Sequence, residues 1–440
     1  MRQRFLVLAV TLSLALTVSA QDASVQQILD SPQFRTAAAF IEKDQPRFVK
    51  ELIELTEIPS PPFKEQRRAR VFLEMLRQSG LSDVEMDQEG NVMGLRKGSG
   101  LPDGAQAKAG LPDGAQAKAG GAGMVAVAAH LDTVFPEGTD VKVKREGTKL
   151  LAPGVGDNTR GAALMLAVIR AMDAAKFQTA KDILFVGNVG EEGEGDLRGV
   201  KFLMQKGKYK DRITQFIAID GGDQGSITRG GVGSRRYRVT FKGPGGHSYG
   251  AFGLVNPAYA MGSAIAKFSK IQVPAQPKTT FNVGLVSGGT SVNSIPFEME
   301  MVIDMRSVDC GELKKVEDQF LAVVRESVDE ENKVRSTREG RITADPKLIG
   351  DRPCGETSLT APIVQLTTAA VKAFGLTPSY GISSTDSNLA MSLGIPAVTI
   401  GRGPGARAHA LDEWTEVEPK ADVKSVQVAM TIILAIAGGS

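Results

Sequence analysis

The sequence has few of the residues that would place it in several common protein classes. Its 440 residues include only two cysteines, Cys310 and Cys354, so the disulfide framework of a small secreted domain is excluded. One bridge between them could still form in an oxidising compartment, and the sequence leaves that open. Lys and Arg number 52 against 50 Asp and Glu, and this balance offers no basic surface to nucleic acid.

Long hydrophobic runs are missing except at the N-terminus. Arg2 and Arg4 precede an apolar run at residues 5–18, and small residues follow as far as Ala20. The run is shorter than the roughly 20 residues that a membrane helix needs, so residues 1–20 are interpreted as a cleaved export signal. An uncleaved N-terminal anchor is the alternative. We expect a periplasmic or secreted protein whose mature chain carries equal numbers of basic and acidic residues.

Several catalytic motifs are absent as well. No GxSxG nucleophile elbow appears, since GHSYG at residues 246–250 has this spacing but lies in a glycine-rich loop, and neither cysteine has a motif histidine beside it. The glycine-rich stretches GVGDNTRG and GRGPGARAH lack both the P-loop lysine and the context of a dinucleotide site. Nucleophilic serine or cysteine hydrolysis and nucleotide binding are therefore disfavoured.

The length predicts two or three folding units of ordinary globular composition. Periodicity predicts helices over residues 25–55 and 64–79, followed by strands over 91–97 and 124–129. Between those strands, the sequence LPDGAQAKAG occurs twice in tandem over residues 101–120. We interpret this duplication as an exposed loop rich in Gly and Ala, with no chemistry of its own.

From residue 124 onward, strands alternate with helices, which predicts an α/β domain with a mostly parallel sheet flanked by helices. The strands are 124–129, 182–188, 216–220 and 397–400, and the helices are 161–174, 199–205, 361–374, 387–393 and 418–437. A different pattern interrupts them, with strands 235–242, 280–286 and 299–307 and helices 257–271 and 311–328. We therefore expect one domain made of residues 21–232 and 351–440, interrupted by a smaller α+β domain at 233–350.

The chain has only three histidines, each in a polar or glycine-rich stretch. His130 ends the predicted strand VAVAAH, and Asp132 follows two residues later. A metal-bound imidazole commonly donates its other ring N–H to a carboxylate, and the HxD pattern supplies one. On its own, however, this pattern fits an ordinary surface histidine better.

Four acidic residues follow other predicted strands or loops of the same domain. Glu191 and Glu192 follow the strand DILFVGN, Asp220 ends the strand FIAID, and Asp157 lies in the loop before a helix. Ligand sites of open α/β sheets lie at the carboxyl ends of the strands.

His409 adds a second imidazole in the stretch GARAHALDEW, after the predicted strand AVTI. Such mixed nitrogen and oxygen donors suit Zn²⁺, and a shared carboxylate can bridge two ions. One residue of the Glu191–Glu192 pair could then ligate a metal while the other accepts a proton. The alternative for this pair is a solvated run of charge.

The ordered motifs HLD, GDN, GNVGEEGEGD, IAIDGG, GPGGHSYG and AHALDEW closely resemble the M20 family of dizinc peptidases and amidohydrolases, over nearly all of the mature chain. The resemblance implies two zinc ions, for which Co²⁺ or Mn²⁺ can substitute. It implies that His130 and Asp220 bind one ion, that Glu192 and His409 bind the other, and that Asp157 bridges both. Glu191 would be the general base, Asp132 would orient His130, and the peptide bond from Asp157 to Asn158 would be cis.

The resemblance also implies that the inserted domain is a lid through which the chain forms a homodimer. His247, in KGPGGHSYG, would reach the active site of the partner and stabilise the oxyanion. Asn293 and Arg306 match lid positions that contact substrate, although a turn residue and a surface charge are the alternatives. Asp386 could position one end of the substrate, or it could cap the helix that begins near Ser387.

These features predict an exported zinc exopeptidase, such as an aminopeptidase, that cleaves short peptides by attack of a metal-bound hydroxide activated by Glu191. Aspartate at position 220 resembles the tripeptidase and dipeptidase branches of the family. An N-acyl amino acid deacylase or desuccinylase is the enzymatic alternative. A periplasmic solute-binding protein is the non-enzymatic one, and the complete ligand set with a base beside it argues against that class.

Overall fold

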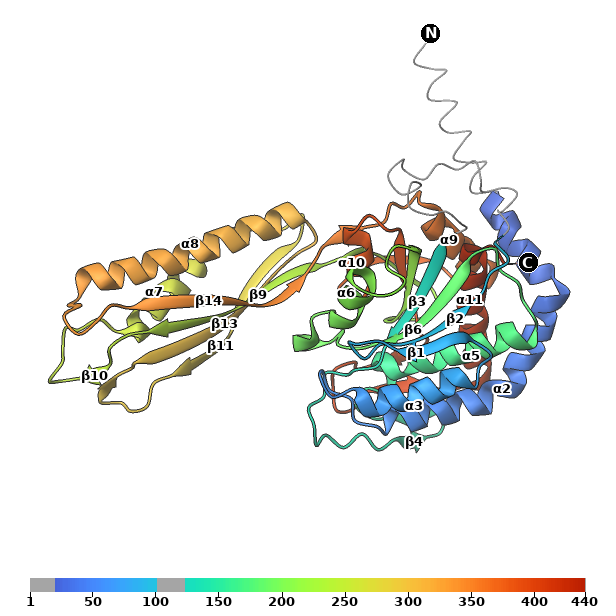
Figure 1. Ribbon diagram of the computed structural model, residues 1–440, viewed down its shortest axis with the longest axis horizontal. Coiled ribbons are helices and arrows are strands. Elements are labelled where there is room, and N and C mark those ends of the chain that lie inside the picture. The colour runs from blue at the N-terminus through green and yellow to red at the C-terminus, as the bar shows by residue number, and fades with distance from the viewer. Residues whose placement is uncertain (1–19, 101–122, 440) are drawn as a thin grey trace, which may run out of the picture. The chain divides into compact units, whose positions relative to one another are not determined.

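The computed structural model describes residues 20–100 and 123–439, which form two compact units (Figure 1). The first unit contains the described residues up to Gly230 and from Glu356 onward, and the second runs from Gly231 to Gly355. The predicted insert, residues 233–350, lies within the second unit. The predicted signal falls outside the described residues except for Ala20, and the tandem duplication at 101–120 lies outside them entirely.

The first unit is built on a nine-stranded sheet whose central strands are parallel. Strands β6, β3, β7 and β17 lie side by side in that order and run parallel, whereas β1–β2, β2–β6 and β17–β8 are antiparallel pairs. All of β3 and most of β6 are buried, as expected of parallel strands covered on both faces. In spatial order the strands are β1 (Ser82–Met86), β2 (Val92–Arg96), β6 (Asp182–Asn188), β3 (Met124–His130), β7 (Ile213–Ile219), β17 (Ala397–Ile400), β8 (Ser226–Gly231) and β15 (Gly355–Glu356), with β16 (Ser379–Ser383) paired to β8.

Helices cover both faces of this sheet (Figure 1). Because successive strand residues point to opposite faces, the odd-numbered residues from Val125 to Ala129 join one hydrophobic cluster and the even-numbered residues from Met124 to Ala128 join another. The prediction of a mostly parallel sheet flanked by helices is confirmed. The first cluster includes α2 (Pro32–Thr56), α3 (Gln66–Arg77), α5 (Gly161–Ala174), α9 (Pro362–Ala373) and α11 (Pro419–Ala437), and the second includes α6 (Arg198–Gln205) and α10 (Ser387–Ser392).

The helix predicted over residues 25–55 is interrupted. Residues 20–30 are helical, the chain bends at Ser31, and α2 begins at Pro32. The Ser31 hydroxyl accepts a hydrogen bond from the amide of Phe34 at 3.0 Å. Proline suits the first helical position because its missing N–H would have no partner there. Capping chemistry therefore starts a new helix inside a continuous apolar pattern.

The second unit is a four-stranded antiparallel sheet with two helices on one face (Figure 1). Its fourth strand, β14, was not predicted, because Pro346 and Gly350 within it are typical of loops. Proline is tolerated there because β14 lies at the edge of the sheet. The strands in spatial order are β11 (Thr279–Gly288), β13 (Glu298–Ser307), β9 (Gly233–Lys242) and β14 (Thr343–Arg352), and the helices are α7 (Pro257–Phe268) and α8 (Cys310–Val334).

A disulfide bond joins Cys310, the first residue of α8, to Cys354, just beyond the end of β14. The sequence left this pairing open. The bridge closes a loop of the second unit with a separation of 44 residues. A short antiparallel pair at the other end of the sheet joins β10 (Gly246–His247) to β12 (Ser294–Ile295).

A small antiparallel sheet in the first unit brings two distant loops together. Strand β19 (Trp414–Glu416) pairs with β5 (Lys149–Leu151), which pairs with β4 (Lys144–Glu146), and β18 (Gly405–Ala406) pairs with β19. This pairing places the stretch before β19 beside the loop that follows β5. The first stretch contains His409, and the second leads to Asp157 in the one-turn helix η1 (Val155–Arg160).

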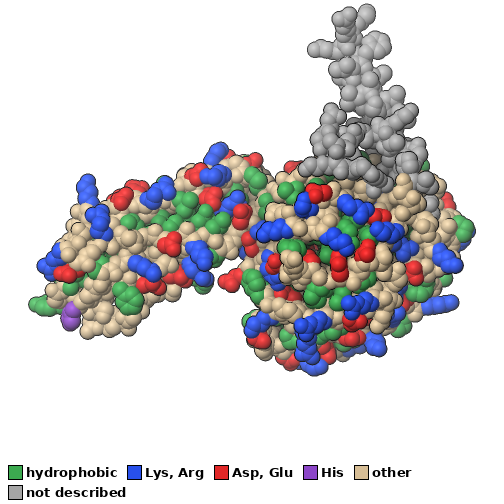
Figure 2. Space-filling model, in the orientation of Figure 1, with side chains coloured by type: hydrophobic (Ala, Val, Ile, Leu, Met, Phe, Trp, Pro, Cys, Tyr) green, Lys and Arg blue, Asp and Glu red, His purple; other side chains and the backbone are tan. Residues whose placement is uncertain are grey.

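The surfaces carry charge of both signs. In the face shown in Figure 2, Lys and Arg are interspersed with Asp and Glu over each unit. Within the described part of the chain, no helix is both long enough and apolar enough to cross a membrane.

Candidate metal centre

The predicted ligands gather at the carboxyl end of the central sheet. His130 is the last residue of β3, Asp220 directly follows β7, and Glu191 and Glu192 come shortly after β6. These three strands are neighbours and run parallel, so the residues that follow them meet at one edge of the sheet.

His130 is buried, and each of its ring nitrogens faces an aspartate. Its Nε2 lies 3.3 Å from Asp157 Oδ1, and its Nδ1 lies 3.1 Å from the backbone oxygen of Asp132. The carboxylate of Asp132 is farther from Nδ1, at 3.7 Å. The backbone oxygen of Asp132 is therefore the closer partner of the ring.

The Asp132 carboxylate has a second set of partners, which the sequence did not indicate. Its two oxygens accept hydrogen bonds from the backbone amides of Glu191 at 3.0 Å and Glu192 at 2.7 Å. Asp132 is fully buried, and the two glutamates are nearly so. One carboxylate thus holds the turn that presents both glutamates to His130.

Asp157 lies between the two imidazoles. Its Oδ1 is 3.3 Å from His130 Nε2, and its Oδ2 is 3.3 Å from His409 Nε2. His409 Nε2 also lies 2.9 Å from Glu192 Oε1. The peptide bond from Asp157 to Asn158 is cis, as the family resemblance implied.

These side chains form three overlapping groups that could hold a metal ion. They are His130–Glu191–Glu192, His130–Asp157–Asp220 and Asp157–Glu192–His409, and in each group the candidate ligand atoms lie within 4.8 Å of one another. Asp157 is common to two groups that contain different histidines. Imidazole nitrogen and carboxylate oxygen are donors that Zn²⁺ and related cations take, so the residues fit two ions that share one carboxylate.

The surrounding carboxylates raise the pKa of both histidines. Burial lowers the pKa of His130, but Asp132 and Asp157 outweigh burial, and the pKa lies well above its ordinary value. Hydrogen bonds with Asp157 and Glu192 raise the pKa of His409 to about 10. The negative potential that favours a proton on each ring also favours a metal cation.

The two aspartates respond differently to the same surroundings. Burial raises the pKa of Asp157, but Arg402 and both histidines lower it well below its usual range. Burial and the charge of Asp157 raise the pKa of Asp220, and the opposing charge of Arg402 only reduces this effect.

Two charged residues of the centre were not predicted, although both lie in stretches that the sequence singled out. Arg402, in GRGPGARAH, places its Nη1 2.6 Å from Asp220 Oδ1 and 3.5 Å from Asp157 Oδ1. Glu413, in AHALDEW, is buried and accepts hydrogen bonds from the backbone amides of Gly154, Gly156 and Asp157. Their positions in the sequence could have indicated them, because Arg402 comes two residues after the end of β17 and Glu413 comes four residues after His409.

Asp386 lies buried at the start of α10, and the proposal that it caps this helix is wrong. Its side chain makes no capping hydrogen bond, because the residue already has helical backbone angles. Thr385 Oγ1 instead accepts the hydrogen bond from the amide of Ser387 at 3.3 Å. Asp386 Oδ2 accepts a hydrogen bond from Asn188 Nδ2 at 2.9 Å, and burial raises the pKa of Asp386 to about 7.

The remaining predicted residues, His247, Asn293 and Arg306, belong to the second unit, whereas all the groups above belong to the first. His247 and Asn293 lie together, because the Ser248 amide donates to the Asn293 carbonyl and both residues line a hollow of about 370 Å³. Arg306 lies near the opposite end of the sheet, where its Nε is 2.7 Å from Asp304 Oδ2.

Comparison with known sequences identifies related proteins. The sequence model for peptidase family M20/M25/M40 matches residues 126–435. The chain is 23% identical over 387 residues to succinyl-diaminopimelate desuccinylase from Corynebacterium glutamicum, covering 84% of this chain and 92% of that protein. It is 24% identical over 181 residues to carboxypeptidase G2 from a Pseudomonas strain, covering 40% of this chain and only 43% of that protein.

Among solved structures, the chain resembles aminopeptidase PepT from Bacillus cereus. The TM-score is 0.68 at 21% sequence identity, and the match covers 89% of this chain and 99% of that one. At this identity the likeness shows a shared fold.

Proposed function

Because the chain belongs to peptidase family M20/M25/M40, it is a peptidase or amidohydrolase, and we propose that it is an exported dizinc exopeptidase acting on short peptides. The observation that carries this proposal is the position of Asp157, whose two oxygens face two different histidines at the same distance of 3.3 Å. Each histidine belongs to its own group of candidate ligands. A bridging carboxylate between two such groups is the arrangement that a dinuclear hydrolase needs.

We assign His130 and Asp220 to one zinc ion, Glu192 and His409 to the other, and Asp157 to both. Two ions bound there supply Lewis acidity to the scissile carbonyl and to the attacking water, and Co²⁺ or Mn²⁺ can take the place of zinc. The half-exposed side chain of His409 leaves this edge of the centre open on its own unit.

Glu191 serves as the general base. Its carboxylate belongs to the group with His130 and Glu192, and the Asp132 carboxylate fixes its backbone amide. The base takes a proton from the water that attacks the amide carbon, and it then delivers a proton to the departing amine. Asp132 acts as a positioning residue for both His130 and this turn.

The second unit contributes His247, Asn293 and Arg306 in this proposal. His247 would donate a hydrogen bond to the oxyanion in the partner's active site, Asn293 would contact substrate, and Arg306 would bind a substrate carboxylate. Large apolar side chains lie exposed near His247, which supports an interface with a second copy there. They are Tyr249, Phe252, Val292 and Phe297.

Two classes of substrate are candidates. Aspartate at position 220, which resembles the tripeptidase and dipeptidase branches of the family, favours di- and tripeptides. The desuccinylase relative favours N-acyl amino acids as the second candidate. A solute-binding protein would need neither a general base nor a bridging ligand.

The test is hydrolysis of a panel of di- and tripeptides, N-acetyl amino acids and N-succinyl amino acids by the mature protein loaded with Zn²⁺ or Co²⁺. The matched variant is Glu191→Gln, which keeps the size of the side chain and removes the base. We expect peptide turnover that needs metal and falls by at least about a hundredfold in the variant, at unchanged metal content. Turnover confined to acylated amino acids would select the deacylase, and failure to bind metal would refute the proposal.

A further inference from the structure

Arg402 introduces an asymmetry into the metal centre. Its guanidinium contacts Asp220 and Asp157, two of the three ligands in the group with His130. In the other group, Glu192 forms an ion pair with His409 alone among the described residues. Arg402 therefore contacts two ligands of the His130–Asp157–Asp220 position. At the Asp157–Glu192–His409 position it contacts only the shared ligand, Asp157.

The Arg402 side chain is largely buried, and its backbone is anchored by a neighbouring arginine. The Arg402 side chain is only 11% exposed, and Arg160 Nε donates a hydrogen bond to the Arg402 carbonyl at 2.9 Å. Gly156 lies alongside it, because a Cβ built on this glycine would be 3.9 Å from Arg402 Nε and Nη2. Arginine stays protonated at any pH that proteins tolerate, so this positive charge is permanent.

A divalent cation that uses Asp220 and Asp157 as ligands competes with this charge. The carboxylate oxygens are shared, and the two positive charges repel each other over a few ångströms of largely dry protein. Among the described residues, Arg402 forms an ion pair with neither Glu192 nor His409, so this repulsion is weaker at the position that they form with Asp157.

We propose that Arg402 makes the two metal positions unequal, so that the His130–Asp157–Asp220 position binds a divalent cation more weakly than the Asp157–Glu192–His409 position. The inference rests on the two-metal centre proposed above. It predicts stepwise loading, in which the position of His409 fills first. Arg402 then acts as a positioning residue that sets the affinity of the second step.

The test is calorimetric titration of the metal-depleted mature protein with Co²⁺, comparing the wild type with Arg402→Gln. For the wild type we expect two steps whose dissociation constants differ by about tenfold or more. In Arg402→Gln the weaker step should tighten by about tenfold or more, while the tighter step changes by less than about threefold. The control is Arg407→Gln, because Arg407 is exposed on the same loop and pairs with Asp412; both of its steps should match the wild type.

A gain of affinity at one step cannot come from general damage to the fold, which would weaken both steps. Equal steps in the wild type, or a weaker step that stays the same or loosens in Arg402→Gln, would overturn the inference while leaving the dinuclear centre intact. Absence of any metal binding by the wild type would overturn both. If Arg402→Gln does not fold, Glu192→Gln shows which position binds the cation more tightly. This variant should lose the tighter binding step. Loss of the weaker step instead would contradict the assignment of the tighter step to the Asp157–Glu192–His409 position.

Discussion

Asp386 and Asn188 form a buried polar pair close to the candidate metal ligand His130. Asn188 Nδ2 donates to Asp386 Oδ2, while Asn188 Oδ1 and Asp386 Oδ1 have no hydrogen-bond partner among the described residues. A proton on Asp386 Oδ1 would make this oxygen a hydrogen-bond donor. Burial raises the pKa of Asp386 to about 7, so the carboxyl group is neutral in the folded protein at pH values below about 7.

This pair makes the stability of the protein depend on pH. The folded pKa of Asp386 is raised above its unfolded value, so its contribution to stability is present at low pH and is lost as pH rises from about 4 to 7. Asp386→Asn has no such titration. We expect the free energy of unfolding of the variant, relative to the wild type, to increase by roughly 2–3 kcal/mol between pH 5 and pH 8.

Urea unfolding at both pH values measures this difference. The control is Asp329→Asn, which changes an exposed carboxylate of α8 and should show no comparable trend. A relative stability of Asp386→Asn that is flat or falls with pH would mean that Asp386 is ionised when buried.

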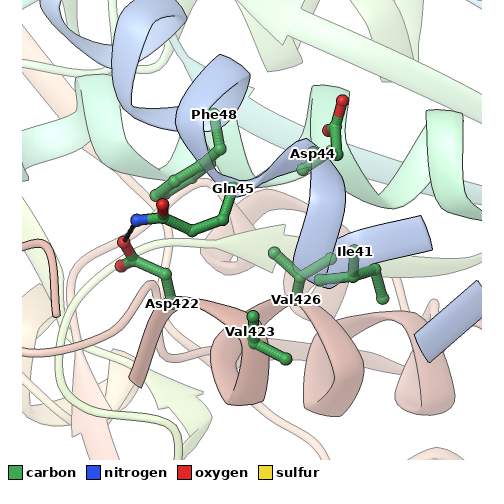
Figure 3. A pocket seen from close by; sticks show the side chains of 8 residues that line it. Ile41, Asp44, Gln45, Phe48, Asp422, Val423 and Val426 are labelled. Atoms are coloured by element: carbon green, nitrogen blue, oxygen red, sulfur yellow. Dashed lines mark hydrogen bonds between the residues drawn. The ribbon is translucent and has the colours of Figure 1, made fainter. Parts of the chain in front are cut away.

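At the scale of elements, Arg160 connects the loop of Asp157 to three other segments. Its side chain is fully buried and donates to the carbonyls of Arg402 and Glu416 and to the carboxylate of Asp422 in α11. Gln45 of α2 donates to the other oxygen of Asp422 at 2.8 Å, beside a cavity of about 10 Å³ (Figure 3). Helices on one face of the sheet thereby fix the loop of Asp157 at the carboxyl end of the sheet.

Loss of this connection should be costly. Arg160→Met leaves the buried Asp422 carboxylate without its ion-pair partner and two carbonyl groups without their donor, and we expect a loss of about 3–5 kcal/mol in the free energy of unfolding. Metal affinity should fall as well, because the segments of Asp157 and Arg402 lose a common anchor. Urea unfolding of the metal-depleted protein and a metal titration measure the two effects.

Two further variants test whether the loss of stability comes from the buried contacts of Arg160 and not simply from removing an arginine. Arg77→Met removes an exposed ion pair with Glu74 and should change stability by less than about 1 kcal/mol. The double variant Arg160→Met with Asp422→Leu removes both buried charges, so it should be more stable than Arg160→Met alone. A double variant as unstable as the single one would show that the carbonyl contacts of Arg160 matter more than its ion pair.

At the scale of the whole molecule, the sequence predicted the fold class and the residues that gather at the candidate metal centre. It could do so because the carboxyl ends of β3, β6 and β7 must meet when these strands run parallel. The interruption before α2 and the edge strand β14 were missed. In both places a proline has an effect that the hydrophobic pattern of the surrounding residues does not reveal. A proline begins a helix in one case and is tolerated at a sheet edge in the other.

Buried charged residues were the other class that sequence reasoning missed. Arg160, Arg402 and Glu413 look like surface charges in a single sequence, since Arg and Glu are seldom buried without a partner. Their partners come from segments far along the chain, such as Asp422 for Arg160 and Asp220 for Arg402. Only the folded structure brings these pairs together.

The assembly of the protein can be tested through the separate positions of its two proposed catalytic groups. Glu191 lies in the first unit and His247 in the second. If two copies pair and His247 acts on the partner, a dimer of one Glu191→Gln chain and one His247→Ala chain contains a single complete active site. That site combines Glu191 from one copy with His247 from the other.

We therefore expect each variant alone to have little activity, and an equimolar mixture, after subunit exchange, to recover about a quarter of the wild-type rate. Random pairing makes half of the dimers mixed, and each of these has one working site of two. Peptide hydrolysis measures the recovery, with a mixture of Glu191→Gln and the double variant Glu191→Gln with His247→Ala as the inactive control. No recovery despite proven exchange would place His247 in the active site of its own chain, or outside catalysis.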